Sequence, residues 1–257
     1  MKVVIIGSGN VATVMGSQVA AAGHSLLQVV ARNEAAAAAL AAEWGCGYTT
    51  RWEELEPDAD LYIVSVSDRA LAELGGRLSL PGRLVVHTAG AVPLSALAAV
   101  SERHGVLYPL QSLRKEIRPF PEFPLLIDAA RAEDLALLDG FARSIARQVQ
   151  RADDALRIKL HVAAIFANNF TNHLYSLSAD FCRREDIDFS LLLPLIEETA
   201  QRVERYDPRT VQTGPAIRGD RATMDRHLEI LTNYHNMSAL YRVFSDQIAS
   251  YYNTLEG

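Results

Sequence analysis

The sequence predicts an α/β protein in which a doubly wound parallel sheet is followed by an all-helical C-terminal part. Three observations support this class. Short apolar strands alternate with helices over residues 1–152, a glycine-rich turn follows the first strand, and the pattern from Asp153 onward is helical almost to the end. Alternation of this kind produces βαβ units and a parallel sheet. We therefore expect an α/β domain over 1–152 and a helical domain over 153–257.

The elements follow from local patterns in chain order. β-Branched and apolar runs indicate strands at 2–6, 26–31, 60–66, within 81–90, 105–108, 125–128 and 148–151. Between them, small and apolar residues at helical spacing indicate helices at 10–22, 34–44, 68–78, 93–103 and 132–147. The last part should hold helices at 155–182, 189–206 and 221–254, the last of them broken or continuous. Strands this apolar are typical of a sheet covered on both faces.

The composition excludes several classes of protein. With 257 residues, 49% apolar residues and a net charge of −6, the chain resembles a globular protein and not a general nucleic-acid binder. The start of the chain does not resemble a signal peptide, and no apolar run is long enough to cross a membrane. Cys46 and Cys182 are too far apart in sequence to suggest a disulfide framework. We expect a cytoplasmic protein with no membrane or nucleic-acid partner and no metal.

The turn "GSGNVA" after the first strand carries the clearest functional signal. It fits the pattern G-x-G-x-x-G/A of the Rossmann dinucleotide-binding fold, in which Gly7 makes the tight turn, Gly9 admits a pyrophosphate and Ala12 permits close packing. The amides of Asn10 and Val11 would face the phosphates from the start of a helix. The alternative is a purely structural glycine turn. The residues expected to bind a dinucleotide here are Gly7, Ser8, Gly9, Asn10 and Val11.

Arg32 predicts which dinucleotide binds. It follows the second strand, where NAD-binding proteins carry an acidic residue and where an arginine can accept the 2′-phosphate of NADP. A guanidinium group matches phosphate in geometry and is permanently charged. Asn33 could add a hydrogen bond. The alternative is a solvated arginine at the end of a strand, but the sequence favours NADP (or NADPH) as cofactor.

Other strand ends should border the same crevice. We expect Val66 and Ser67 beside the ribose and pyrophosphate, and Thr88 and Ala89 near the nicotinamide. His87 is a candidate proton donor or substrate contact, although a histidine bonded only to backbone is as good an interpretation. Gln111, in "YPLQS", is a candidate substrate contact or a structural residue.

The first helix of the C-terminal part carries polar residues among apolar ones. At about 100° per residue, His161, Asn168 and Asn172 point within about 20° of one direction, and Asn169 lies within about 80° of it. An unsatisfied buried polar group costs about 1–3 kcal/mol, so this stripe should have partners. We expect it to face the cofactor crevice; a structural network or a subunit interface are the alternatives.

The segment "GPAIRGD" is a second candidate in the C-terminal part. Arg218 and Asp220 lie on a glycine-flanked loop and could reach a substrate. Equally, Asp220 could cap the following helix and Arg218 could pair with it.

Together, "MKVVIIGSGNVA", "HTAG", "YPLQS", "KLHVAAIFANNF" and "TGPAIRGDRATMDRHLEIL" resemble a bacterial family of NADP oxidoreductases with a C-terminal helical domain of unassigned function. The layout is distantly similar to pyrroline-5-carboxylate reductase, 6-phosphogluconate dehydrogenase and the β-hydroxyacid dehydrogenases. The resemblance implies a substrate bound between the domains and a homodimer formed through the helical part. The β-hydroxyacid dehydrogenases carry a lysine and, four residues later, an asparagine on this helix. Here Lys159 points away from His161, and position 163 is alanine.

Two functions fit these observations. One is an NADPH-dependent reductase of a small C=O or C=N substrate, in which His161 protonates or orients the substrate and Asn168 or Asn169 fixes it. His87 and Arg218 would be supporting contacts. The other is a non-catalytic NADP(H) sensor whose helical part is an interaction surface. A pocket beside the polar stripe would favour the reductase, and a stripe buried in a subunit interface would favour the sensor.

Overall fold

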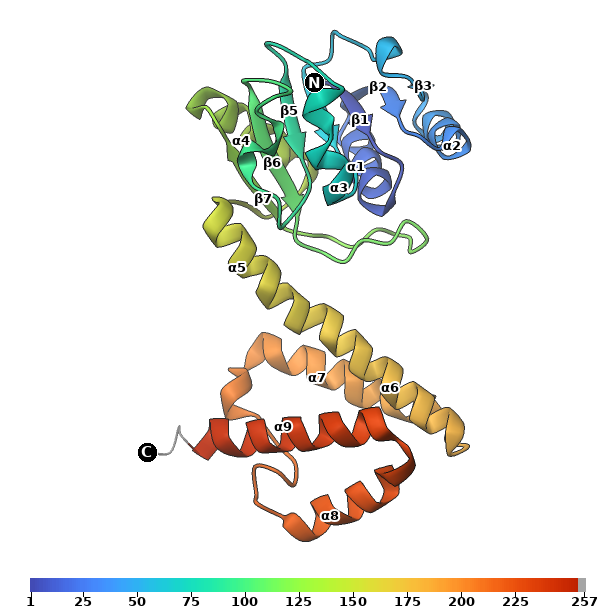
Figure 1. Cartoon of the computed structure of the whole chain (residues 1–257), viewed down its shortest axis with the longest axis vertical. Helices are drawn as coiled ribbons and strands as arrows, with labels where there is room; N and C mark the ends of the chain where they lie inside the picture. The colour runs from blue at the N-terminus through green and yellow to red at the C-terminus, as the bar shows by residue number, and fades with distance from the viewer. Residues whose placement is uncertain (254–257) are drawn as a thin grey trace. The chain divides into compact units, whose positions relative to one another are not determined.

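The computed structural model describes residues 1–253, and the chain separates into two compact units, Met1–Phe170 and Thr171–Gly257 (Figure 1). The first unit holds the whole sheet and also the first helix after it. The predicted fold class, a doubly wound sheet followed by a helical region, is confirmed. The functional boundary expected at residue 152 stays a prediction, since the first compact unit reaches past it.

The sheet has eight strands in the order β3-β2-β1-β4-β5-β6-β7-β8. Its first five positions follow the Rossmann order, so the chain reverses direction across the sheet between β1 and β4. The strands are β1 Lys2–Ile6, β2 Ser25–Val30, β3 Gly47–Thr49, β4 Leu61–Val64, β5 Leu84–His87, β6 His104–Pro109, β7 Leu125–Ala129 and β8 Val149–Arg151. Strand β3 was not predicted, because a strand of three residues that begins with a glycine is too short for a periodic pattern. It forms because Gln28 to Val30 of β2 offer it a parallel edge.

The pairing of β6 with β7 is antiparallel, whereas the other neighbours pair parallel. The expectation of a wholly parallel sheet is wrong at this one position. A parallel return requires a crossover connection, usually a helix. Residues 110–124, between the two strands, contain no helix, and the amide of Leu110 donates to the carbonyl of Pro124 where the segment closes.

Both faces of the sheet are covered. Helices α1 (Asn10–Ala21) and α4 (Ala132–Ile145) pack on one face, against the alternate residues of β1, β4 and β5 that include Val3 and Ile63. The opposite face, with Val4 and Tyr62, is covered by short helical segments. These are α3 Asp68–Ala72, η2 Leu74–Gly76 and η3 Leu94–Leu97, while α2 Glu34–Trp44 packs beside β2.

Two predicted helices are therefore shorter than expected. The helix predicted at 68–78 is a short α-helix followed by a 3₁₀ turn, and the one predicted at 93–103 is only the 3₁₀ turn η3. In the first, Gly75 and Gly76 weaken the helix. In the second, the Ser101 hydroxyl donates to the carbonyl of Arg83 at 2.6 Å and its oxygen accepts from the amide of Arg103, so that this serine organises a loop.

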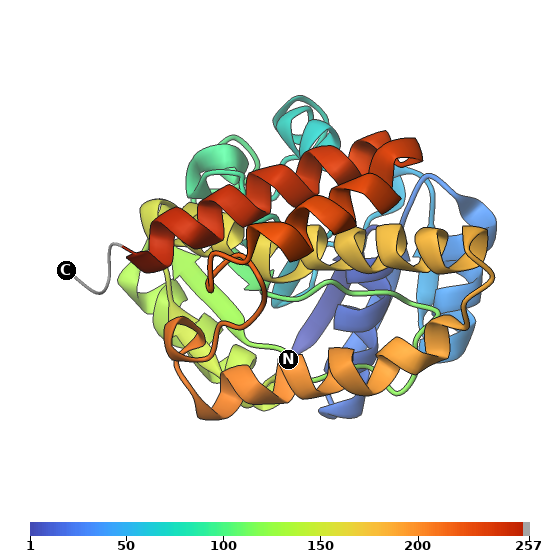
Figure 2. The same cartoon turned by 90° about the horizontal axis from the view of Figure 1, so that it is seen from below.

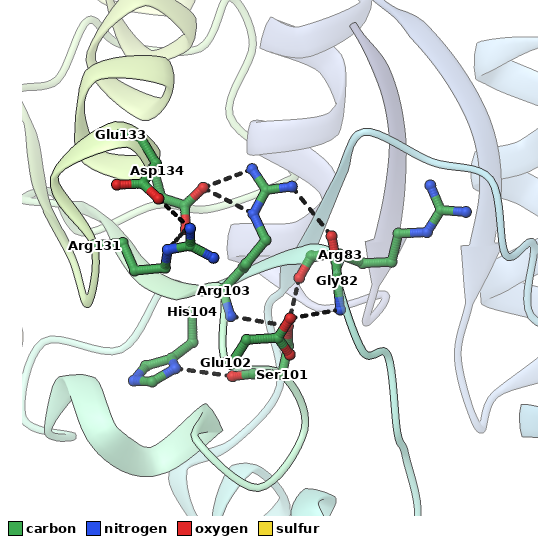
Figure 3. Close-up of polar contacts among 9 residues, drawn as sticks. All are labelled: Gly82, Arg83, Ser101, Glu102, Arg103, His104, Arg131, Glu133 and Asp134. Atoms are coloured by element: carbon green, nitrogen blue, oxygen red, sulfur yellow. Dashed lines mark hydrogen bonds and ion pairs between the residues drawn. The ribbon is translucent and has the colours of Figure 1, made fainter.

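An ion pair fastens the amino-terminal end of β6 to α4 (Figure 3). The Arg103 guanidinium donates twice to Oδ1 of Asp134, at 2.9 and 2.6 Å, and once to the carbonyl of Gly82 at 3.1 Å. Asp134 is fully buried, and Arg131 adds a second cation at 3.9 Å from its Oδ2. This cluster lies at the edge of the sheet opposite to the carboxyl ends of the strands.

The helix expected at 155–182 is not a single α-helix. It consists of α5 (Asp154–Ala164), the π-helical segment η4 (Ile165–Phe170) and α6 (Thr171–Arg184), of which only the last belongs to the second unit. A π-helix winds more slowly than an α-helix because its hydrogen bonds span five residues. The directions expected for Asn168 and Asn169, at about 100° per residue, are therefore wrong.

The described residues of the second unit form helices joined by turns and loops, with no strand among them, as predicted (Figure 2). The long predicted helix at 221–254 is broken at Tyr234 within the described residues. After α6 the unit contains η5 Phe189–Leu192, α7 Leu193–Arg205, η6 Pro208–Thr210, α8 Arg221–Ile230, η7 Leu231–Asn233 and α9 His235–Asn253. Among residues 1–253, no helix has the length and hydropathy needed to cross a bilayer.

Candidate cofactor and catalytic site

A cleft of about 580 Å³ opens at the carboxyl ends of β1, β2, β4 and β5. Ligands of doubly wound sheets bind at this edge, beside the position where the strand order reverses. The volume lies within the usual range of small-molecule sites. All of the residues expected to bind a dinucleotide line this cleft: Gly7, Ser8, Gly9, Asn10, Val11, Arg32, Asn33, Val66, Ser67, Thr88 and Ala89.

The glycine-rich turn has the geometry that a pyrophosphate requires. Gly7 has a φ of +129°, and a Cβ there would lie 2.2 Å from the carbonyl oxygen of Ser65, so only glycine fits. Gly9, directly before α1, has open space where a Cβ would be. A phosphate can therefore approach the free amides at the start of α1, where the helix dipole favours an anion. These residues fit a dinucleotide.

Arg32 lies beyond the end of β2, exposed and at the border of the cleft. Within residues 1–253 its guanidinium has no hydrogen-bond or ion-pair partner, so it is available to a ligand. Asn33 is the N-cap of α2, and its Oδ1 accepts from the amide of Ala36 at 3.0 Å. The side-chain NH₂ group of Asn33 does not take part in this cap.

Thr50, Trp52 and Arg77 are among the further cleft residues that were not expected from the sequence. Thr50 and Trp52 follow the unpredicted strand β3, and Arg77 follows η2. Arg77 lies 3.6 Å from Glu73, which also lines the cleft. The position of Thr50 and Trp52 depends on β3, whose shortness hid them. No motif marks Arg77.

His87 is fully buried at the end of β5. Its Nδ1 accepts from the amide of Ala89 at 3.2 Å, which leaves the proton on Nε2 to donate to the carbonyl of Pro93 at 3.2 Å. Burial, reinforced by the charge of Arg157, lowers the pKa of His87 to about 4. The ring is therefore neutral near pH 7 and holds the backbone at the cleft edge. This geometry matches the structural interpretation of His87, because its ring proton is bonded to the carbonyl of Pro93.

The side chains of a tyrosine and a histidine meet beside Gly90, the residue that follows Ala89. The Tyr108 hydroxyl, near the end of β6, lies 3.1 Å from Nδ1 of His161 on α5, and both side chains are half-buried. Gly90 packs against the pair: a Cβ there would lie 2.9 Å from the tyrosine Oη and 3.0 Å from the histidine Nδ1. The structure thus joins "HTAG", "YPLQS" and the first helix after the sheet at one point. Tyr108 was not among the expected site residues.

Arg157 fixes the position of α5. It lies one helical turn before His161 and is 1% exposed. Its Nη2 donates to the carbonyl of Val92 at 2.5 Å and to Asp154 at 2.7 Å. Asp154 in turn accepts from the amide of Leu94 at 2.9 Å. The loop after β5 and the first turns of α5 are therefore held together, and His161 is held beside Gly90. Arg157 was not among the residues expected from the sequence to form the site.

The remaining candidates of the first unit are exposed. Asn168 and Asn169 lie in η4 and are open to solvent. Gln111 is exposed too, and its Oε1 accepts from the amide of Ser112 at 2.9 Å, so this side chain stabilises its own loop. The same loop reaches the glycine-rich turn, where the amide of Lys115 donates to Oδ1 of Asn10 at 3.4 Å.

Asn172, Arg218 and Asp220 belong to the second unit. Asn172 and Arg218 are exposed. Asp220 is the N-cap of α8 and accepts from the amide and the hydroxyl of Thr223, as its structural interpretation requires. The start of "GPAIRGD" lines a separate, mainly apolar cavity of about 280 Å³ within this unit, together with residues of α6 and α9.

Comparison with known proteins gives the family. The N-terminal part, residues 2–90, matches a family described as "NADP oxidoreductase coenzyme F420-dependent", and residues 123–248 match a "domain of unknown function (DUF2520)". A structure from Bacteroides fragilis described as a "putative NADP oxidoreductase" is 39% identical, with 97% of this chain and 98% of that one covered and a TM-score of 0.89. The chain belongs to this family of NADP oxidoreductases.

More distant structures share the fold of this oxidoreductase. An imine reductase from Myxococcus stipitatus in complex with NADP⁺ is 14% identical, with 99% of this chain and 93% of that one covered and a TM-score of 0.67. A 1-pyrroline-5-carboxylate reductase from Streptococcus pyogenes is also 14% identical, with 97% and 98% covered and a TM-score of 0.66. No curated protein sequence matches the chain. Family membership confirms the predicted oxidoreductase class and its NADP cofactor.

Proposed function

We propose that the oxidoreductase uses NADPH to reduce a small substrate with a C=N or C=O bond. One observation carries this proposal: Tyr108 and His161, a hydrogen-bonded pair of proton-carrying side chains, pack against Gly90, the residue that follows the cleft-lining Thr88 and Ala89. When bound, the nicotinamide supplies a hydride. The protein has to position the substrate and provide a proton.

Different residues of the cleft would bind different parts of NADPH. The turn at Gly7 and Gly9 and the amides that start α1 would receive the pyrophosphate. Arg32, uncompensated by any acidic side chain among the described residues, would take the 2′-phosphate as a bidentate donor. Thr88 and Ala89, at the end of β5, would border the nicotinamide.

His161 is the proton-handling residue expected from the sequence, and its setting supports that role. It is half-buried, in contact with Tyr108, and kept in place by the Arg157 and Asp154 bonds one and two turns earlier on α5. We propose that Asn168 and Asn169 contribute hydrogen bonds to the substrate and that Gln111 is a supporting contact, while the substrate roles of Asn172 and Arg218, in the second unit, stay predictions. The named reactions of the imine and pyrroline-carboxylate reductases, which share the fold, favour C=N over C=O as the first substrate class to test.

We further propose a homodimer formed through the helical unit. Large apolar side chains remain exposed there, including Leu191 (72%), Leu195 (60%) and Val203 (54%) along η5 and α7. An exposed apolar patch of this kind marks an interaction surface. Cys46 and Cys182 are both free thiols, which suits a reducing compartment such as the cytoplasm.

Thermal unfolding with and without ligands tests the function. NADPH at a hundred times its Kd should stabilise the protein by about 2.7 kcal/mol, and NAD at the same concentration by much less. A panel of cyclic imines, 2-oxo acids and cyclic ketones should then be assayed for NADPH oxidation. The loss of the absorbance of the reduced cofactor, at about 340 nm, measures this reaction. Tight NADPH binding with no substrate oxidising it would favour the sensor. Absence of NADPH binding would contradict both functions.

A further inference from the structure

We propose that Tyr108, and not His161, gives its proton to the substrate, and that His161 restores the proton to Tyr108. This inference rests on the reductase function proposed above. It assigns a catalytic role to Tyr108 and changes the role of His161 from direct donor to proton relay.

The position of Tyr108 in the sheet favours it as the donor. It is the penultimate residue of β6, which lies next to β5, so its ring is anchored on the sheet at the edge where the cleft opens. Gly90, which follows the cleft residue Ala89, packs against its ring: a Cβ there would lie 2.7 Å from the tyrosine Cζ. His161 reaches the same point from a helix. Side chains on strands and helices of the scaffold are placed more precisely than those on loops, so both rings are held as a proton transfer between them requires.

The electrostatic surroundings suit a neutral phenol that gives up a proton transiently. Burial raises the pKa of Tyr108, so that the phenol keeps its proton near pH 7, while the positive charge of Arg157 acts in the opposite direction. Arg157 is buried, and its Nε and Nη1 have no hydrogen-bond partner among the described residues. Its charge is therefore only partly compensated and would stabilise a phenolate at Tyr108. Arg157 is a positioning residue, since it acts through Tyr108 and the loop at Val92.

The proposed step balances as follows. The substrate carbon accepts a hydride, the O–H bond of Tyr108 breaks, and a new N–H or O–H bond forms on the substrate. The resulting phenolate takes the proton from Nδ1 of His161, which lies 3.1 Å away. His161, which is half-buried, takes a proton from solvent at Nε2 as its Nδ1 gives up a proton, so that the imidazole stays neutral. The net reaction consumes one hydride and one proton for each substrate reduced.

The test compares Tyr108→Phe, His161→Gln and a control, Tyr62→Phe. The control also removes a hydroxyl from a buried tyrosine, one that donates to the carbonyl of Glu56 at 2.7 Å on another part of the sheet. With the substrate found in the imine and ketone panel, Tyr108→Phe should lower kcat by about 100-fold and leave the Kd for NADPH within about twofold. His161→Gln should lower kcat less, because the phenol remains, and Tyr62→Phe should retain wild-type kcat.

A second readout needs no cofactor or substrate. The ¹⁵N chemical shift of His161 Nδ1 in the free protein should change in Tyr108→Phe and stay unchanged in Tyr62→Phe, because Tyr108 is the hydrogen-bond partner of this nitrogen among the described residues. Wild-type kcat in Tyr108→Phe, or a larger loss in His161→Gln than in Tyr108→Phe, would overturn the donor role alone. An unchanged Nδ1 shift would overturn the relay. A wild-type protein that binds NADPH but reduces none of the panel would overturn the reductase function, and the donor role with it.

Discussion

The guanidinium of Arg157 donates a 2.5 Å hydrogen bond to the carbonyl oxygen of Val92 and so joins the first helix after the sheet to the loop that follows β5. This bond aligns His161, one turn later on the helix, with Gly90, two residues earlier in the loop. The buried side chain of Arg157 thereby determines where His161 and Gly90 meet. The predictions below test this site, the cofactor preference, the frame of the sheet and the helical surface.

Replacing Arg32 with aspartate should reverse the cofactor preference. The carboxylate would repel the 2′-phosphate of NADP and could instead bond the ribose hydroxyls of NAD. We expect NADP binding to weaken by about 100-fold, which corresponds to roughly 2.7 kcal/mol. Calorimetric titration of both cofactors measures this. Arg69→Ala, an exposed arginine that does not line the cleft, is the control. Equal binding of NAD and NADP by the wild type would refute the role of Arg32.

Replacing Gly90 with alanine should disturb the Tyr108–His161 pair without changing NADPH binding. The new methyl group would meet Tyr108 and His161 atoms at 2.7 to 3.0 Å, so at least one ring must move. We expect kcat to fall by about tenfold or more, since small displacements of reacting groups are costly. Gly140→Ala is the control, because a Cβ there meets nothing within 4 Å and alanine favours a helix such as α4. Equal kcat values for the two variants would show that the contact at Gly90 is unimportant.

Replacing Asp134 with asparagine should destabilise the fold and spare the site. The carboxylate is fully buried and accepts two hydrogen bonds from Arg103. Loss of a buried charge partner should lower the free energy of unfolding by about 1–3 kcal/mol. Urea unfolding measures the change, and NADPH titration should show an unchanged Kd. Asp139→Asn, which breaks an exposed pair with Arg143 on the same helix, should lower the free energy of unfolding much less than Asp134→Asn does. A larger loss from Asp139→Asn than from Asp134→Asn would contradict this ranking.

Buried His87 should make stability fall in mildly acidic solution. Burial lowers its pKa from 6.5 to about 4 in the folded state. As the pH falls, the unfolded chain therefore binds the proton first, which favours unfolding. The contribution of neutral His87 is complete above about pH 6.5 and is lost as the pH falls toward about 4, on the order of 3 kcal/mol in total. Urea unfolding between pH 7 and pH 4.5, at intervals of roughly half a pH value, should show a steeper decline in the wild type than in His87→Gln. Parallel declines would contradict the assignment.

Placing a charge on the exposed face of α7 should dissociate the proposed homodimer. Leu195 is 60% exposed, and glutamate there would have to be desolvated in an apolar interface. We expect Leu195→Glu to halve the mass measured by light scattering while helicity is retained. Glu197→Gln, an exposed substitution on the same helix, should leave the mass unchanged. A monomeric wild type would refute the dimer.

The cofactor half of the site could be predicted from the sequence because it depends on local patterns. Gly7 and Gly9 come directly after a strand and before a helix, and Arg32 follows the next strand, so spacing along the chain defines spacing in the fold. The same reasoning found the strands that carry Val66 and Thr88. These residues lie together because parallel strands end at the same edge of the sheet.

The catalytic half could not be predicted in the same way. Tyr108 meets His161 only because β6 lies next to β5 and because Arg157 holds α5 to the loop at Val92, and neither contact leaves a periodic trace in the sequence. The directions of Asn168 and Asn169 were wrong because the α-helical period does not apply in η4. His87 shows the opposite problem: its residue type suggested chemistry, but its hydrogen bonds go to backbone, which only the structure reveals.

Gly90 also restricts how this family of chains can diverge. Any side chain at that position would occupy the space of the tyrosine ring and the imidazole, so the three positions cannot mutate independently. A relative that carries alanine or serine at this point of the chain should show a displaced tyrosine or histidine ring, another residue in place of one of them, or a shifted first helix. Coupled changes of this kind would distinguish relatives that keep the proposed proton transfer from relatives in which the same fold catalyses another reaction.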